Sequence, residues 1–362
     1  MALKTENAGI ASGAAVATGR VRGAQRAAMK PAKSSAENFE HPVPMLDHLV
    51  EGPRAWWRDT ISRADWLMPI PERGLAETAA IVEALRSDPL PTFLLDPHEF
   101  QLPEWVGLMQ EVRRRLDEGC GVVVLDRLPV EEWTPQETRD VFWLIGVLLG
   151  RPVVQSITGE ILVDVSDTGV KKTIGVRGFR TNTGQLPHTD NSFNRCPPDY
   201  VSLCSLRQAR EGGESRFISF YTVHNELMKR SPHLLRRLYR PFYQDRQGDF
   251  RAGESQTVSY PVFEFRRELR VRFTHFTIPA GYQTAGEPFE GETKAAFEAI
   301  SELVSDPSLY CSFVIEPGQL QFVNNRSFGH GRTEYKDWDD EASKRHLLRL
   351  WHRDWGRRGY NG

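Results

Sequence analysis

The sequence predicts a mainly β fold with flanking helices, and two observations lead to this fold class. From residue 153 onward, short runs of β-branched and aromatic residues alternate with turn residues, as in a sandwich or barrel. Before residue 150, two amphipathic stretches of helical period lie on either side of one buried strand. Because a jelly roll manages the edges of many short strands by pairing two sheets, we expect a jelly-roll core.

Composition limits the class of partner. The chain has 362 residues, 40% of them hydrophobic, which is enough to bury a core. Its formal net charge of −2 gives no electrostatic reason to expect nucleic acid, and no apolar run approaches the roughly 20 residues of a membrane helix. Four cysteines without C-x-x-C spacing fit a reducing cytoplasm. We therefore expect a cytoplasmic protein with a small-molecule partner, no nucleic acid and no membrane, and we leave a homo-oligomer open.

The region before residue 119 divides into two parts. Residues 1–38 are rich in Ala, Gly, Lys and Arg and contain only two acidic residues, which favours a disordered tail over an organellar presequence. Residues 39–118 predict a helical N-terminal cover, whose firmest element is a helix at Glu104–Glu118 ended by Gly119. We assign residues 119–362 to the main β domain.

The main domain begins with a strand and a well-marked helix. Val122–Asp126 is a short β-branched run after glycine, which is typical of a buried strand. Thr134, Pro135 and Glu137 then form a capping-box pattern for a helix that ends at Gly150. Further strands are predicted at Ile161–Val165, Tyr200–Leu206, Ser215–Ser219, Val258–Phe263, Leu269–Phe276, Ser312–Ile315 and Gln319–Val323, and further helices at Tyr221–Arg240 and Glu292–Val304.

An imidazole and a carboxylate two residues apart, His188 and Asp190, form the first candidate site. On an extended backbone both side chains leave the same face and can meet one small ion. We expect the third ligand to be His330, just past a strand, where Gly329 and Gly331 permit close backbone approach. Two histidines and one carboxylate with open positions are the pattern of non-haem Fe(II) oxygenases. The same residues around zinc would serve a hydrolase, so the metal stays open at this point.

Two arginines four residues apart form the second candidate site. Arg345 and Arg349 fall on one face of either a strand or a helix, and apolar residues at 347, 348, 350 and 351 indicate a segment that packs inward. A buried guanidinium keeps its charge and offers a planar fork of donors that suits a carboxylate. The pair therefore predicts a site for an anion, with an ordinary surface pair as the alternative.

With these motifs in order, the chain from about residue 119 to residue 355 resembles the Fe(II)- and 2-oxoglutarate-dependent dioxygenases of the taurine dioxygenase and clavaminate-synthase-like group. The resemblance implies a double-stranded β-helix, a jelly roll, that uses Fe(II), 2-oxoglutarate and O₂. A non-catalytic jelly-roll binding protein is the remaining alternative. The matching segments are Gly119–Leu125, Leu148–Pro152, His188–Phe193, Gly212–Ser215, His330–Thr333 and Arg345–Arg349.

The resemblance also implies roles for individual residues. His188, Asp190 and His330 would hold the iron, and Arg345 with the hydroxyl of Ser215 would bind the distal carboxylate of 2-oxoglutarate. Arg349 would lie near the substrate or near the other end of the cosubstrate. Related halogenases have a small residue in place of Asp190, so this carboxylate implies hydroxylation, or a desaturation or ring closure.

Residues around these motifs suggest the class of substrate. Several arginines and amides near the metal motif favour a small polar or anionic metabolite, of amino acid or carboxylate type. The expected product of hydroxylating such a molecule is released together with succinate and CO₂. Candidate substrate-binding residues are Arg180, Thr183, Gln185, Asn191, Phe193 and Arg332.

Overall fold

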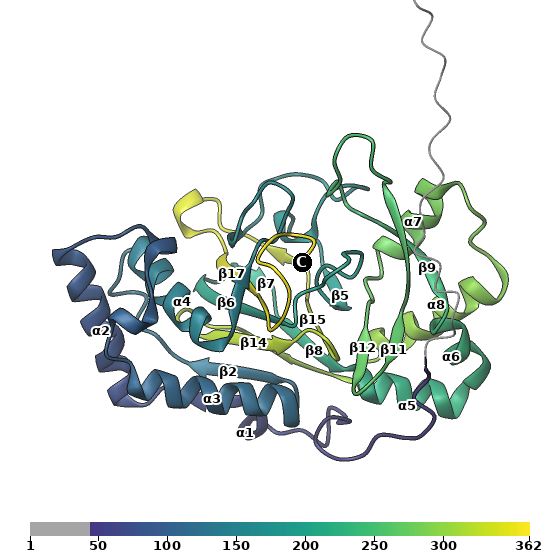
Figure 1. The fold of residues 1–362 in the computed structure, drawn as a ribbon, viewed down its shortest axis with the longest axis horizontal. Helices are drawn as coiled ribbons and strands as arrows, with labels where there is room; N and C mark the ends of the chain where they lie inside the picture. Colours follow the sequence, from purple (N-terminus) through teal and green to yellow (C-terminus); the bar gives the residue numbers. More distant parts are fainter. Residues whose placement is uncertain (1–43) are drawn as a thin grey trace, which may run out of the picture. The chain divides into compact units, whose positions relative to one another are not determined.

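Two sheets organise the computed structural model, which describes residues 44–362. These residues lie within one compact unit, and the predicted tail at residues 1–38 lies outside the described part. The large sheet has the order β1-β2-β14-β6-β17-β3, with β4 paired to β17, and the small sheet has the order β13-β8-β15-β5 (Figure 1). The large sheet comprises β1 Leu67–Pro69, β2 Val122–Asp126, β3 Arg151–Val153, β4 Leu162–Val165, β6 Tyr200–Arg207, β14 Leu320–Asn324 and β17 His346–Arg353, and the small sheet comprises β5 Gln185–His188, β8 Ser215–Ser219, β13 Tyr310–Phe313 and β15 Phe328–Arg332.

Helices and three short ribbons complete the described part of the chain. The ribbons are β7 Glu211–Gly212 with β16 Tyr335–Lys336, β9 Pro241–Asp245 with β10 Thr257–Pro261, and β11 Phe263–Phe265 with β12 Leu269–Val271. The helices are α1 Arg63–Trp66, α2 Glu72–Ser87, α3 Pro103–Glu118, α4 Pro135–Leu149, α5 Phe220–Arg230, α6 Pro232–Leu238, α7 Thr277–Ala285 and α8 Gly291–Ser305. Within residues 44–362, no helix combines the length and the apolar character needed to span a bilayer.

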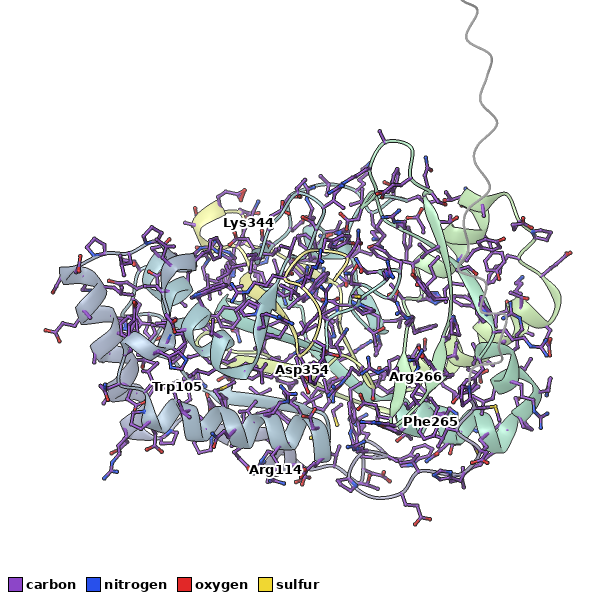
Figure 2. All side chains as sticks on the ribbon, viewed as in Figure 1. Trp105, Arg114, Phe265, Arg266, Lys344 and Asp354 are labelled. Atoms are coloured by element: carbon purple, nitrogen blue, oxygen red, sulfur yellow. The ribbon has the colours of Figure 1, made fainter. Side chains whose placement is uncertain are left out.

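The large sheet is buried on both faces at β2, where alternate side chains belong to two different buried clusters. Val122 and Val124 belong to the same buried cluster as Phe217 of β8 in the small sheet. Val123 and Leu125 join the cluster formed with α3 and α4, which includes Trp105, labelled in Figure 2. Successive side chains of a strand point to opposite faces, so a run of valines suits a strand covered by helices on one side and a second sheet on the other. The predicted jelly-roll architecture is confirmed.

The predicted helices before residue 150 are confirmed, with their caps. α3 spans Pro103–Glu118 and buries one apolar stripe, and Gly119 ends it. At the start of α4, Thr134 Oγ1 accepts a hydrogen bond from the Glu137 N–H at 3.2 Å, and the Thr134 N–H donates to Glu137 Oε2 at 2.7 Å. A capping box satisfies two of the backbone donors that a helix leaves unpaired, so this start is fixed locally.

Several predicted elements differ from the structure. The single helix expected at Tyr221–Arg240 is wrong, because Pro232 cannot continue α5 and instead begins α6 at its first position. The strand expected at Leu269–Phe276 ends at Val271, and Val258–Phe263 is divided between β10 and β11. His330 lies past a strand, β14, as expected, but it also lies within a further strand, β15, which no apolar run predicts.

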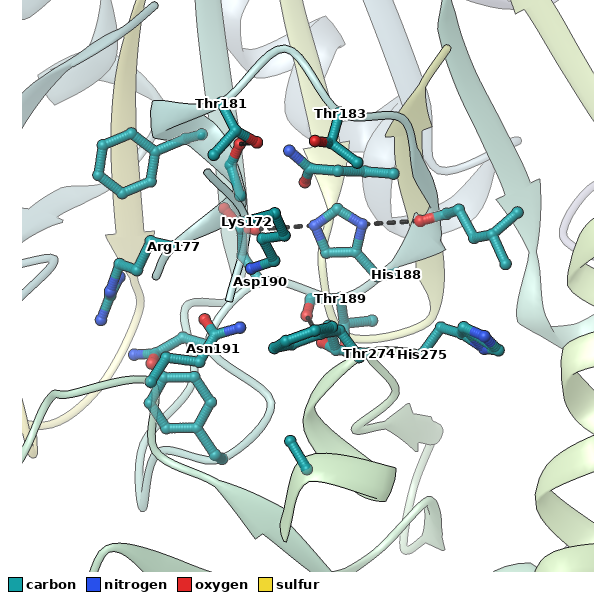
Figure 3. Close-up of a pocket in the computed structure, with 18 of the residues that line it drawn as sticks. Lys172, Arg177, Thr181, Thr183, His188, Thr189, Asp190, Asn191, Thr274 and His275 are labelled. Carbon is teal, nitrogen blue, oxygen red and sulfur yellow. Dashed lines mark hydrogen bonds and ion pairs between the residues drawn. The ribbon is translucent and has the colours of Figure 1, made fainter. Parts of the chain in front are cut away.

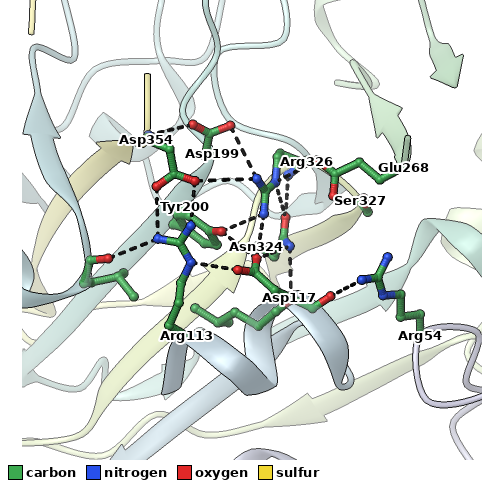
Figure 4. Close-up of polar contacts among 12 residues, drawn as sticks. Arg54, Arg113, Asp117, Asp199, Tyr200, Glu268, Asn324, Arg326, Ser327 and Asp354 are labelled. Carbon is green, nitrogen blue, oxygen red and sulfur yellow. Dashed lines mark hydrogen bonds and ion pairs between the residues drawn. The ribbon is translucent and has the colours of Figure 1, made fainter. Parts of the chain in front are cut away.

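A partly buried polar network links α3 to the sheets (Figure 4). Arg326, in the turn between β14 and β15, donates to Asp117 Oδ1 of α3 at 2.6 Å. Arg113 of α3 binds the Asp354 carboxylate through both terminal nitrogens, at 3.0 and 2.6 Å. The neighbouring Asn324 donates to the Leu116 carbonyl at 3.0 Å and so satisfies one acceptor at the end of the helix.

Two buried histidines, His224 and His352, predict a pH dependence of stability. Burial lowers the pKa of His224 and of His352 to about 4, so the folded state keeps both neutral where the unfolded state takes up protons, below about pH 6.5. The free energy of unfolding of the metal-free protein should therefore fall from pH 6.5 to 5, by at most about 1.4 kcal/mol per pH unit for each histidine. Urea titrations across this range measure it. Replacing the exposed His233 with alanine should leave the slope unchanged, and a flat profile would contradict the prediction.

Candidate active site

Two imidazoles and one carboxylate oxygen converge between β5 and β15. The Nε2 atoms of His188 and His330 lie 3.4 and 3.6 Å from Asp190 Oδ1. The two histidines are directly paired across the strands, and their rings are 4.8 Å apart. His188 is the last residue of β5, and Asp190 lies in the turn that follows it, so the pair meets through a turn and not along one strand as expected.

The glycines on either side of His330 are required by the neighbouring strands. A Cβ on Gly331 would lie 2.5 Å from the Gln185 carbonyl oxygen, and one on Gly329 would lie 2.8 Å from the Phe220 ring. Any larger residue would push β15 away from β5. The expected close backbone approach at His330 is therefore present, although it arises inside a sheet.

Hydrogen bonds hold Asp190 on both its backbone and its side chain. Asn325 accepts from the Asp190 N–H at 2.7 Å and donates back to its carbonyl at 3.2 Å. On the side chain, Oδ2 accepts from Trp351 Nε1 at 2.7 Å and from Arg349 Nη1 at 3.1 Å. The other carboxylate oxygen, Oδ1, is the one that faces the two histidines.

The donor set fits a divalent metal ion. His188 Nδ1 lies 2.9 Å from the Leu186 carbonyl, which favours the proton on that nitrogen and leaves Nε2 as an acceptor. Burial lowers the pKa of His330 to about 4, so its ring is neutral at neutral pH. Burial raises the pKa of Asp190, but Arg349 and the histidines lower it more, so the carboxyl is ionised. Within residues 44–362 these three side chains form the group that places its ligand atoms within 4.8 Å of one another, and such converging acceptors need a cation.

A cavity of about 440 Å³ opens beside these residues (Figure 3). The segment 172–191 and the start of α7 form its walls, and His188 and Asp190 lie on its inner side. Aromatic side chains contribute much of the surface, including those of Phe179, Phe193, Phe276 and Trp351. A concave, partly apolar site with a few converging polar groups is typical of a small-molecule pocket.

Three cationic side chains line the cavity, and Asp190 is the one carboxylate among the lining residues. Lys172 donates to the Val176 carbonyl and lies 4.3 Å from the Phe276 ring centre, and burial lowers its pKa to about 8. Arg177 forms an ion pair with Asp249. Arg349 donates to Gln155 Oε1 at 2.8 Å through Nε, while its Nη2 is buried without a partner among the described residues. Two of these three cations thus already bind a carboxylate, Arg177 that of Asp249 and Arg349 that of Asp190.

Another cation, Arg345, is buried just before β17 and does not line this cavity. Its guanidinium lies 5.0 Å from the Tyr335 ring centre, and burial lowers its pKa. Within residues 44–362 no carboxylate forms an ion pair with it, and its Nη1 has no hydrogen-bond partner. Gly213, at φ +73°, lies against it, since a Cβ there would be 3.2 Å from Arg345 Nε. Ser215 follows in β8 and is buried.

The predicted substrate-binding residues fall into two groups. Thr183, Gln185, Asn191 and Phe193 line the cavity together with Arg349. Arg180 and Arg332 do not line it. Arg180 is exposed, and Arg332 donates to backbone carbonyls of residues 178, 181, 182 and 333, which fixes the loop that leads into β5.

Sequence reasoning missed five residues around the cavity. Lys172, Arg177 and Trp351 line it, and Asn325 holds the Asp190 backbone. The fifth is Tyr360, whose hydroxyl lies 3.0 Å from Asn191 Oδ1 and 3.1 Å from Arg177 Nη2. Trp351 could have been found, because it is two residues from Arg349 and so shares its face of a strand. The others are brought in by distant segments and give no local signal.

Comparisons with known proteins agree with this geometry. Residues 86–351 match the model of the taurine catabolism dioxygenase TauD, TfdA family. The chain is 30% identical over 318 residues to FR-33289 synthase of Streptomyces rubellomurinus, covering 85% of this chain and 91% of that protein. It is 26% identical over 298 residues to the taurine hydroxylase-like protein SAT17 of Stachybotrys chartarum, covering 79% of this chain and 74% of that one.

Solved structures share the fold at lower identity. An asparagine oxygenase in complex with Fe(II), 3-hydroxyasparagine and succinate superposes with a TM-score of 0.61 at 19% identity, over 80% of this chain and 94% of that one. The non-haem iron oxygenase OrfP in complex with Fe and α-ketoglutaric acid gives 0.58 at 15% identity, over 80% and 94%. The family match spans most of the chain, and the histidines and carboxylate that iron requires converge within it. The chain belongs to the TauD/TfdA dioxygenase family and is an Fe(II)- and 2-oxoglutarate-dependent oxygenase.

Proposed function

We propose that this oxygenase hydroxylates an unactivated C–H bond of a small anionic metabolite of amino acid or carboxylate type. One observation carries the proposal. His188 and Asp190, whose side chains converge with that of His330, line a cavity whose other charged lining residues are the cations Lys172, Arg177 and Arg349. The balanced reaction consumes substrate, O₂ and 2-oxoglutarate and yields hydroxylated product, succinate and CO₂.

In this proposal, His188 Nε2, His330 Nε2 and Asp190 Oδ1 hold Fe(II). The iron, when bound, supplies oxygen activation coupled to decarboxylation of the oxo acid. The chain fixes its ligands beforehand. The Leu186 carbonyl orients the His188 ring, and Asn325 anchors the turn that carries Asp190. Such pre-orientation supports metal binding, because the ligand side chains lose little conformational entropy when the metal binds.

Arg345 and Ser215 bind the distal carboxylate of 2-oxoglutarate in this proposal. Arg345 is a buried cation that forms no ion pair in the described part of the chain, and only the nearby Tyr335 and Asp337 raise its pKa against the effect of burial. An anion that pairs with it would therefore be stabilising. Its Nη1, which has no partner among the described residues, supplies a donor, and the Ser215 hydroxyl supplies a second one from β8 of the small sheet. A guanidinium and a hydroxyl together suit one carboxylate.

The substrate class follows from donors that the chain leaves unused. Arg349 Nη2 and Asn191 Nδ2 are buried at the cavity without partners among the described residues. Together with Lys172 they favour an anionic group such as a carboxylate. Thr183, Gln185 and Phe193 complete the proposed substrate contacts, whereas Arg332 supports the wall through backbone carbonyls. The structural likeness to an asparagine oxygenase supports an amino acid.

Succinate formation tests the proposal. The Fe(II)-loaded protein with 2-oxoglutarate and O₂ is incubated with single compounds from a panel of amino acids, dicarboxylates and taurine. We expect one or more anionic members to stimulate succinate formation and to gain one oxygen atom by mass spectrometry. Loss of two hydrogens instead would indicate desaturation or ring closure. Turnover without O₂ would contradict the oxygenase and favour a zinc hydrolase.

We further propose that residues 39–118 act as a helical cover on an oxygenase domain of residues 119–362. The burial of α2 and α3 against α4 and the large sheet supports this division. A cytoplasmic location and a homo-oligomer stay predictions, and light scattering on the purified protein tests the second.

A further inference from the structure

We propose that Trp351 is a positioning residue that fixes the Asp190 carboxylate so that a single oxygen is presented to the metal. This inference rests on the proposed ligand set. The inference gives the indole N–H of Trp351 a role, although Trp351 lies outside the set of proposed metal ligands.

The two oxygens of Asp190 have different surroundings. Oδ2 accepts the Trp351 Nε1–H at 2.7 Å and Arg349 Nη1–H at 3.1 Å. Oδ1 lies 3.4 Å from His188 Nε2 and 3.6 Å from His330 Nε2. A carboxylate with two donors on one oxygen cannot rotate without breaking both hydrogen bonds. The hydrogen bonds therefore select Oδ1 as the ligand atom.

Of the two donors, Trp351 is the one dedicated to Asp190. Arg349 also binds Gln155 and keeps Nη2 toward the cavity, so an anion that enters the cavity competes for its charge. The indole has one donor of fixed direction and no charge. Its side chain is 1% exposed and packs with Val153 and Val201, which flank it on β3 and β6. Trp351 therefore keeps its bond when the cavity fills.

The alternation of side chains along β17 explains why Trp351 can reach Asp190. In β17, Leu348 and Leu350 point into the cluster shared with α3 and α4, and the residues between them point to the opposite face. Arg349 and Trp351 consequently reach the same carboxylate from adjacent positions on that face. One strand thus supplies both donors.

The chemical consequence concerns the open positions of the metal. A carboxylate that binds through one oxygen occupies one position, which leaves room for both the oxo acid and O₂ beside two histidines. If Oδ2 were free it could turn toward the metal and take a further position. Loss of an outer partner of a metal ligand typically lowers metal affinity by roughly 10- to 100-fold.

Another buried indole offers a matched control. Trp105 is fully buried and donates from Nε1 at 2.8 Å, but to the Gly74 backbone carbonyl. Replacement by phenylalanine removes one indole donor and a similar volume at either position. The lost bond ends on Asp190 only at position 351, where the ring also lines the cavity and lies against Arg349.

The experiment is an anaerobic titration of the full chain with Fe(II) at saturating 2-oxoglutarate, followed by the visible charge-transfer band of the complex. We expect Trp351→Phe to weaken Fe(II) binding by roughly 10- to 100-fold and to shift the band, because the carboxylate loses its fixed orientation. Trp105→Phe should keep the wild-type affinity and band. A packing role at position 351 would not by itself move the band.

A second variant removes the donor at constant shape. Site-specific 3-benzothienylalanine at position 351 replaces the N–H with sulfur and should reproduce the effect of Trp351→Phe. Wild-type affinity and band in this variant would overturn the inference, even if Trp351→Phe fails to fold. If the wild-type protein itself forms no band with Fe(II) and 2-oxoglutarate, the proposed function fails first, which distinguishes the two outcomes.

Discussion

Replacing Asp190 with alanine is expected to end iron binding at working concentrations and with it all coupled turnover. The methyl group removes one of three ligand atoms and the one negative charge that lines the site. The loss should exceed the roughly 10- to 100-fold that removal of an outer partner costs. Anaerobic Fe(II) titration and succinate formation measure the two effects. Full iron affinity and activity would overturn the ligand assignment.

The alanine variant also leaves Arg349 without its carboxylate, so its stability must be measured alongside. Breaking one partner of a buried ion pair costs about 3–5 kcal/mol, because the other charge stays buried and unpaired. Asp190→Asn is the better-matched variant. Its amide keeps the volume and one oxygen that can accept the Trp351 N–H, while the charge is lost. Weak iron binding by a folded Asp190→Asn protein would therefore assign the effect to the ligand and not to unfolding.

Replacing Arg345 with alanine is expected to raise the 2-oxoglutarate concentration needed for turnover, with iron still bound. Removal of one partner of a buried, hydrogen-bonded charge pair costs about 2 kcal/mol or more, which corresponds to about 30-fold in affinity. Titration of 2-oxoglutarate into the Fe(II) protein, followed by the charge-transfer band, measures the affinity directly. Iron binding should change little, because within residues 44–362 Arg345 forms no hydrogen bond or ion pair with any of the three proposed ligands.

Arg345→Lys is the control for this prediction. Lysine keeps the positive charge but lacks the planar fork, so we expect an affinity between those of the wild type and the alanine variant. An unchanged dependence on 2-oxoglutarate in the alanine variant would move the role to Arg349. The Nη2 of that residue has no hydrogen-bond partner within residues 44–362, and its side chain lines the cavity.

The sequence predicts those parts of the fold that local interactions determine. The capping box at Thr134, the glycine that ends α3 and the valine run of β2 all specify their structure within a few residues. The candidate metal ligands could be predicted from the sequence for a related reason. His188 and Asp190 are neighbours, and the glycines around His330 mark a close approach of backbones.

The rest depends on contacts between distant segments. β15 carries two glycines, an arginine and a histidine, a composition with low strand propensity, and it becomes a strand because β8 and β5 pair with it on both sides. Lys172 and Arg177 reach the cavity on an irregular segment without hydrophobic period. Tyr360 reaches Asn191 across 169 positions of sequence. No pattern within a window of the sequence contains that information.

The turn that links β14 to β15 connects α3 to the turn that carries Asp190. Asn324 and Arg326 bind α3, and Asn325, between them, holds the backbone of Asp190. In a hybrid of two relatives joined at residue 119, Asp117 and Arg326 would come from different parents, while Asn325 would still have to hold the backbone of the proposed ligand Asp190. We therefore expect Asp117 and Arg326, which lie on either side of residue 119, to be inherited together.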